Sequence, residues 1–402
     1  MFDHHRLVIF LVLSCVLIFK STIVSSSVIH HPKQSNDEKL KLVFLFHRHG
    51  ERTPYMLYPN DPYKRNITET VGIGQLINKG KQRLYRLGEY LSKRYYNKCG
   101  DRFPIEQKSP RKVYVRSSGS ERCLQSVSLL LAGMFPPEGE WKWNQNLGSL
   151  WQPFAIQTVP FDHDTLLNPD YKCPVAEHVL DQIYHSEEAQ NIQRKYQNLL
   201  HKVANWTGYK PEEMNIVNAS YIYDVLLSEH NFGLPYPEWL DNNIWNDLKN
   251  INNEVFRFNS SNRKIQRFRC GSMFGEIYRQ LKAHFGNDSQ SNDNHHQIYI
   301  YSTHDEWLAQ FLSSMQVYNG IPPFFGSTIM LEVYQEPQNN GEPYFKGFYL
   351  NSTETGHAYP LQFPSCNEPC TLTKFHESIK DLMIEDPKIL EHECYVDIQK
   401  YL

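Results

Sequence analysis

Residues 42–54 read LVFLFHRHGERTP, and this stretch decides the fold that the sequence predicts. Five apolar residues lead directly into a cluster that contains Arg48, His49 and Arg52. An apolar run of this length is also compatible with a short helix, but its Val and Phe residues, followed closely by Gly and Pro, favour a strand. Because ligand sites in open α/β sheets lie where strands end, the cluster is expected at the carboxyl end of a buried strand.

Two further stretches repeat this arrangement of a strand, ionisable residues and a helix. Residues 112–115 are predicted to form a strand that ends at Arg116, and residues 297–301 a strand that leads into His304 and Asp305. Residues 118–121 have the spacing of a capping box. Residues 327–335 and 345–351 alternate like an antiparallel edge hairpin.

These elements predict an α/β fold whose mainly parallel sheet is flanked by helices in three layers, α/β/α. Residues 38–170 and 295–402 are assigned to this core. Residues 171–294 are rich in Asn and charged helical patterns, and they are interpreted as an inserted, mostly helical lobe.

The first residues indicate export. A 13-residue apolar run at 7–19, followed by several serines, is typical of a signal peptide, which we assign to residues 1–26. An uncleaved anchor is the alternative, but the run is shorter than the roughly 20 residues of a membrane span. The rest of the sequence has no apolar run long enough to span a membrane, so no membrane contact is expected after signal cleavage. The six N-x-Ser/Thr sequons predict a glycoprotein and lie at Asn66, Asn205, Asn218, Asn259, Asn287 and Asn351.

Net charge and cysteine count limit the classes of partner and of metal site that the sequence supports. The 402 residues carry a formal net charge of −3 with scattered basic side chains, so no nucleic-acid partner is expected. Of the eight cysteines, Cys15 lies in the signal peptide, which leaves an odd number in the mature chain. Cys366 and Cys370 are interpreted as a local disulfide because no nearby His or Cys pair completes a tetrahedral metal site.

The cluster at 48–54 suggests chemistry on phosphate. Arg48 and Arg52 offer forked donors that match phosphate oxygens, and their charge lowers the pKa of His49. A neutral His49 keeps a lone pair that can attack phosphorus. Gly50 would let the backbone approach the phosphate. The plainer interpretation is a solvated turn in which Glu51 pairs with an arginine.

The same residues resemble a known family. RHGERTP is similar to the RHGxRxP signature of the histidine acid phosphatases, the acid branch of the histidine phosphatase superfamily, which includes prostatic, lysosomal and insect venom acid phosphatases. Four other segments also resemble that family, namely GQLINKGKQRLYRLGEYL at 74–91, KVYVRSS at 112–118, WQPFAIQTVP at 151–160 and YSTHD at 301–305.

The resemblance implies roles for six residues. His49 is similar to the nucleophile that becomes phosphohistidine, and Asp305 to the proton donor. The phosphate would be bound by Arg48, Arg52 and Arg116 with His304, and the resemblance implies neither a metal nor another cofactor. After RSS the chain has GSERC where many relatives have DVDRT, which puts the shape of that loop in question.

The resemblance also implies a disulfide framework. It pairs Cys173 with Cys394 and Cys366 with Cys370, whereas a further family bridge, expected near Leu227 and Ser327, has no cysteines here. The remaining Cys99, Cys123 and Cys270 are additional to that pattern.

The expected function is a secreted acid phosphatase that hydrolyses small phosphomonoesters, with the lysosomal lumen as the alternative location. Relatives are often dimers, so a homodimer is a candidate assembly. Three rivals stand beside this prediction: a phytase-like phosphatase, a phosphoglycerate-mutase-like phosphotransferase, and a catalytically silent secreted binding or venom protein on the same scaffold. A mutase-like enzyme is disfavoured by the signal peptide, the sequons and residues 52–54, which favour the acid branch.

Overall fold

The computed structural model describes residues 39–97, 110–286, 296–335, 341–354, 356–364, 366 and 369–396. Residues 37–402 belong to one compact unit. The predicted signal peptide at 1–26, Cys99 and Asn287 lie outside the described residues. Within the described ranges, no helix is long and apolar enough to cross a membrane.

A single mixed sheet organises the fold, and the predicted opening strand lies in its centre. The strand order is β2-β3-β1-β4-β5-β6, with β7 paired to β5. β1 is parallel to β3, and β3 is parallel to β2, while β4, β5, β6 and β7 add antiparallel pairs that include the predicted hairpin. The strands are β1 (Lys39–Arg48), β2 (Val113–Ser117), β3 (Ile298–Thr303), β4 (Thr328–Gln335), β5 (Tyr344–Leu350), β6 (Tyr359–Leu361) and β7 (Cys370–Thr371).

Parallel pairing brings the predicted reactive residues to one edge of the sheet. Arg48 is in register with Thr303, and Ser117 with Ser302. The carboxyl ends of β1, β2 and β3 therefore lie side by side, as expected for a ligand site in an α/β sheet.

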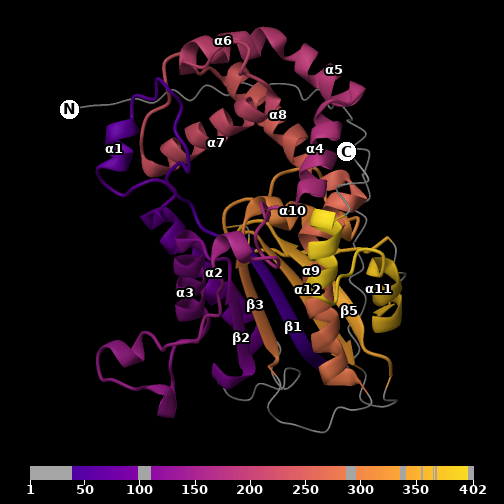
Figure 1. The fold of residues 1–402 in the computed structure, drawn as a ribbon. Coiled ribbons are helices and arrows are strands. Elements are labelled where there is room, and N and C mark those ends of the chain that lie inside the picture. Colours follow the sequence, from indigo (N-terminus) through magenta and orange to yellow (C-terminus); the bar gives the residue numbers. More distant parts are fainter. Residues whose placement is uncertain are drawn as a thin grey trace, which may run out of the picture. The chain divides into compact units, whose positions relative to one another are not determined.

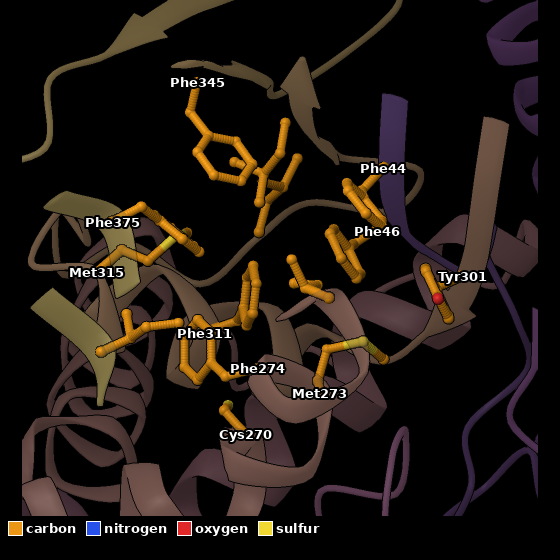
Figure 2. Packing of buried hydrophobic residues seen from close by; sticks show 14 of the residues in the cluster. Phe44, Phe46, Cys270, Met273, Phe274, Tyr301, Phe311, Met315, Phe345 and Phe375 are labelled. Atoms are coloured by element: carbon orange, nitrogen blue, oxygen red, sulfur yellow. The ribbon is translucent and has the colours of Figure 1, made fainter. Parts of the chain in front are cut away.

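Helices cover both faces of the sheet, which confirms the three-layer prediction (Figure 1). Because β1 is buried on both faces, its apolar residues alternate between two cores. Val43 and Leu45 pack with α2 (Asn78–Ser92) and α3 (Glu121–Met134). On the other face, Phe44 and Phe46 pack with Phe274 and Phe311, among other residues, as Figure 2 shows.

That second core is formed mainly by three helices, with the C-terminal segment wrapped over it. The helices are α9 (Arg263–Phe285), α10 (Asp305–Ser314) and α11 (Leu372–Ile379). Two further short helices are α1 (Lys64–Thr68), which precedes α2, and α12 (Pro387–Glu391), which follows α11.

The described residues between 171 and 294 form helices without a strand. Besides α9, these are α4 (Pro174–Tyr184), α5 (Glu187–Lys195), α6 (Gln197–Thr207), α7 (Ile216–Phe232) and α8 (Asn242–Ser261). Helices α6, α7 and α8 share an apolar core of their own. Since α8 and α9 also pack against α10, this helical segment adjoins the sheet edge that carries the reactive residues.

The predicted capping box at 118–121 is wrong. The N-cap residue of α3 is Ser120, whose side chain makes no capping hydrogen bond. Ser118 Oγ lies instead 3.0 Å from His304 Nε2, and Glu121 Oε2 accepts a hydrogen bond from Gln75 Nε2. Long-range partners therefore outcompete the local capping pattern at this helix start.

Both predicted disulfides are confirmed. Cys173 is bonded to Cys394 and Cys366 to Cys370, whereas Cys123 and Cys270 are buried free thiols.

The sequons differ in exposure. Asn66, Asn205 and Asn351 are exposed, while Asn218 and Asn259 are half-buried. Asn259 Oδ1 accepts a hydrogen bond of 2.6 Å from Tyr184 Oη.

Candidate active site

The strand ends bring His49 and His304 together. The two rings meet edge to face with their centroids 5.6 Å apart, and the backbone N–H of His49 donates to Thr303 O. Asp305 follows as the first residue of α10, and its carboxylate lies 2.7 Å from a guanidinium nitrogen of Arg48. Four of the predicted site residues thus form one constellation.

The environment of His49 suits a nucleophile. Its Nδ1 lies 2.8 Å from Gly50 O, and because a carbonyl oxygen only accepts, Nδ1 carries the proton and Nε2 keeps the lone pair. Burial holds the pKa of His49 well below its usual value, and the nearby charges of Arg122 and Arg48 lower it further. The imidazole therefore stays neutral in mild acid. Burial, rather than the arginine charge considered from the sequence, is the largest cause.

Gly50 is required by packing. A Cβ atom at this position would lie 2.6 Å from Gly80 O and 2.7 Å from a methyl carbon of Leu84, so a side chain would push α2 away from the end of β1. The backbone N–H of Gly50 donates to Ser126 Oγ of α3. The structure thus gives a packing reason for a glycine whose sequence interpretation was close approach to phosphate.

Arg48 is held from three sides. Its Nη1 donates to Pro323 O at 2.9 Å, its Nη2 pairs with Asp305, and its guanidinium lies 3.8 Å above the ring of Phe325. Such contacts fix the direction of the guanidinium before any ligand arrives.

Arg52 is held by the helical segment. Its Nη2 lies 3.0 Å from both carboxylate oxygens of Asp224, and its Nη1 donates to Ser228 Oγ at 3.0 Å. Both partners belong to α7. Sequence reasoning missed them because neither lies in a recognisable motif.

Glu51 pairs with an arginine outside the cluster. Its carboxylate, fully buried, receives hydrogen bonds from Arg83 Nε and Nη2 of α2, the shortest at 2.7 Å. This pair joins the end of β1 to α2. The Glu51 carboxylate is therefore paired with Arg83 and not with Arg48 or Arg52. The solvated-turn interpretation therefore does not describe these residues, which are all buried.

Arg116 is occupied by a structural ion pair. Its Nη2 lies 2.9 Å from Asp164 Oδ1 and its Nη1 donates to Ser117 O at 2.7 Å. Asp164 also accepts hydrogen bonds from the backbone N–H groups of Leu166 and Leu167. The guanidinium thus anchors this loop to the end of β2, and this environment does not favour the phosphate role expected from the sequence.

Arg122 adds a third guanidinium to the group formed by Arg48 and Arg52. It lies in the first turn of α3, and its Nη2 donates to His304 Nδ1 at 3.4 Å. Among the charges that lower the pKa of His49 and of His304, that of Arg122 has the largest effect. The sequence signal for it was present in the GSERC segment, where an arginine stands at the same place as in DVDRT.

His304 is neutral in the free protein. Because Arg122 can only donate, His304 Nδ1 is the unprotonated nitrogen, and Nε2 carries the hydrogen that points to Ser118 Oγ. Burial holds the pKa of His304 well below its usual value, and Arg122 and Arg48 lower it further. The thiol of Cys123 lies 3.7 Å from the same Nε2.

Three arginine side chains at this site have an unused donor. In the described part of the chain, the buried Nε atoms of Arg48, Arg52 and Arg122 have no hydrogen-bond partner. Buried donors are rarely left unpaired in proteins. Burial also lowers the pKa of Arg48 and Arg122, which shows that desolvation destabilises their charged forms. The arrangement is suited to a bound oxyanion, and no group of metal-ligating side chains accompanies it among the described residues.

Comparison with known proteins agrees with this geometry. The family described as "Histidine phosphatase superfamily (branch 2)" matches residues 32–349. Prostatic acid phosphatase of Bos taurus is 32% identical over 356 residues, which cover 87% of each chain. Lysosomal acid phosphatase of Pongo abelii is 30% identical over 92% of this chain and 83% of its own.

Solved structures show the same fold. The apo form of Hafnia alvei phytase superposes with a TM-score of 0.62 at 16% sequence identity, over 87% of this chain and 98% of its own. The resemblance stated from the sequence is thereby confirmed. The chain belongs to branch 2 of the histidine phosphatase superfamily.

Proposed function

We propose that this protein is a secreted acid phosphatase that hydrolyses phosphomonoesters through a phosphohistidine on His49. The observation that carries the proposal is a neutral imidazole beside three guanidiniums, those of Arg48, Arg52 and Arg122, each with a buried and unpaired Nε–H. The membership of the chain in its family and its similarity to named acid phosphatases support the enzyme class.

In the first step, Nε2 of His49 attacks phosphorus and the bond from phosphorus to the ester oxygen breaks. The guanidiniums hold the phosphoryl oxygens and stabilise the charge that spreads over them. The hydrogen bond from Nδ1 to Gly50 O orients the ring and stabilises the positive charge that the imidazole gains. His304, whose ring lies beside that of His49, would contact the same oxygens with its neutral ring.

Asp305 is proposed to give its proton to the leaving oxygen. In the free protein its carboxylate is paired with Arg48. A phosphate that binds Arg48 competes with this pair and would release the carboxyl to face the leaving oxygen. In the second step the Asp305 carboxylate takes a proton from water, which attacks phosphorus and breaks the P–N bond to restore His49.

The substitution Asp305→Asn tests this role. It should lower kcat by about 10²-fold for a phosphate ester of an alkyl alcohol, whose poor leaving group needs the proton. For p-nitrophenyl phosphate, whose leaving group is stable as an anion, the loss should be clearly smaller. Equal losses for both esters would contradict the proton-donor assignment.

The surroundings of Asp305 favour leaving groups without further phosphates. Glu306 is the next residue, and burial together with Asp170 raises the pKa of Glu306 to about 8, so in acid this carboxyl is neutral and offers a polyanion no positive charge. Asp224 of α7 lies on the Arg52 side, and the ring of Tyr55 lies 4.9 Å from the Arg52 guanidinium. Carboxyl groups and aromatic rings do not balance the charge of a polyanion such as phytate.

We therefore expect p-nitrophenyl phosphate to be hydrolysed at acidic pH and phytate to react more slowly. The difference should be about tenfold or more in kcat/KM, which corresponds to roughly 1.4 kcal/mol. Parallel assays of both substrates at the same ionic strength measure it. Faster release of phosphate from phytate would favour the phytase-like alternative, and no turnover of either would favour a silent binding protein.

Three further features belong to the proposal. The signal peptide and the exposed sequons at Asn66, Asn205 and Asn351 support a secreted glycoprotein, with the lysosomal lumen as the alternative. A homodimer is the proposed assembly, which light scattering of the purified protein would test. The proposed chemistry uses guanidinium groups for the phosphate charge and assigns no step to a metal or other cofactor.

A further inference from the structure

Two buried carboxyl groups meet outside the proposed catalytic constellation. Asp61 lies in the loop that precedes α1, and Glu229 lies near the end of α7. The two residues are only 7% and 2% exposed, so water does not compensate their charge. Their side chains are close neighbours that act directly on each other.

A hydrogen bond between the two carboxyl groups would need a proton between two acceptors. A carboxylate oxygen only accepts, so one carboxyl oxygen bonds another only when one of the two groups is protonated. Asp61 Oδ1 accepts from the backbone N–H of Tyr63 at 2.8 Å. Asp61 Oδ2 and both oxygens of Glu229 are buried without a hydrogen-bond partner among the described residues. One shared proton resolves this shortage.

The pair is next to a residue that holds Arg52. Glu229 directly follows Ser228, whose Oγ accepts from Arg52 Nη1, and Asp224 lies about one helical turn earlier on α7. Asp61 lies in the segment that continues from the residues after Arg52. The contact between Asp61 and Glu229 therefore ties the two segments that place this guanidinium.

We propose that Asp61 and Glu229 share one proton and that this carboxyl pair positions α7, and through it Arg52, for phosphate binding. Glu229 is thus a positioning residue. The proposal rests on the proposed function only for the role of Arg52.

The groups around the pair do not replace the proton. Tyr58 and Tyr63 face it from the preceding loop, and Lys64 of α1 is the cation that acts on Asp61. Lys64 is exposed, so its charge is screened by solvent. Burial and the neighbouring Asp61 together raise the pKa of Glu229 to about 9.

The sign of the pH effect on stability follows from this shift. Between the usual value of 4.5 and about 9, the folded state keeps a proton on Glu229 that the unfolded state has lost. Folding stability contributed by the pair is therefore greatest in acid and declines as the pH rises through this window.

The substitution Glu229→Gln removes the titrating carboxyl group but keeps a hydrogen-bond donor at the same position. The glutamine amide donates a permanent hydrogen bond to the Asp61 carboxylate, so the contact survives without a titrating group. We expect its KM for p-nitrophenyl phosphate to match that of the wild type and its Tm to fall less between acidic pH and pH 9. Glu229→Ala removes the contact and should raise KM by about tenfold with a smaller change in kcat.

Infrared difference spectroscopy gives a readout that does not depend on activity. The wild type minus Glu229→Gln spectrum at neutral pH should contain the C=O band of a protonated carboxylic acid. The exposed Glu238→Gln serves as the matched control and should remove no such band. A missing band would contradict the proposal that Asp61 and Glu229 share a proton. A Glu229→Gln variant whose KM is raised as much as that of Glu229→Ala would contradict it too.

Failure of the proposed function would look different. A wild type without phosphatase activity would overturn the acid phosphatase proposal, while the infrared band and the pH dependence of Tm would still decide whether the proton is shared. Calorimetric titration with inorganic phosphate would then report on Arg52, with weaker binding expected for Glu229→Ala than for Glu229→Gln.

Discussion

Replacing His49 with alanine is expected to abolish phosphomonoester hydrolysis, with a loss in kcat of about 10⁴-fold or more. The nucleophile is then missing, and neither arginine nor water replaces the covalent step. Acid quenching with a ³²P-labelled substrate should trap a phosphoenzyme in the wild type and none in His49→Ala. The covalent P–N bond is the direct signature of the proposed route.

The exposed His201 of α6 provides the control. His201→Ala should keep both the labelled intermediate and the rate, because that side chain lies at the protein surface. A wild type that turns over rapidly yet never yields a labelled protein, even at short times, would argue for direct attack by water.

The second large effect is expected at Arg122. Arg122→Ala should lower kcat/KM for p-nitrophenyl phosphate by about 10³-fold, because a guanidinium that stabilises the transferred phosphoryl group is lost. Lysine should restore part of the rate, since it returns the charge without the fork. Steady-state kinetics of the three proteins measure this.

Arg116→Ala is the matched comparison, since it also removes an arginine that follows the same predicted strand. Here the expected loss is in stability, about 3–5 kcal/mol, because Asp164 is left as an unpaired buried charge. Urea unfolding should reveal it, while the folded fraction should keep a KM near that of the wild type. If Arg116→Ala raised KM strongly and Arg122→Ala did not, phosphate binding would belong to Arg116 and not to Arg122.

These two arginines show what could be predicted from the sequence. The strand before Arg116 was evident from its residues, because a buried strand imposes its composition locally. Which arginine reaches the histidines depends on how β2 and α3 pack, and that is not encoded within a few neighbouring residues. Arg116 lies within β2 and is paired with Asp164, whereas Arg122 is the second residue of α3 and lies beside His304.

The partners of Arg52 were beyond sequence reasoning for a related reason. Asp224 and Ser228 are 172 and 176 positions away along the chain, and they reach Arg52 only because the fold brings α7 beside the residues that follow β1. His49, His304 and Asp305, by contrast, each follow directly from a strand end. Parallel pairing of β1 with β3 was enough to predict that these side chains meet.

The carboxylates that hold Arg48 and Arg52 have a consequence for turnover. Inorganic phosphate, the product, must compete with Asp305 and Asp224 for the same guanidinium groups. We therefore expect the product to bind less tightly than bare arginines would hold it, since each phosphate contact replaces an existing ion pair. Two resident carboxylates thus shorten the time for which the product remains bound and keep the site open for the next substrate.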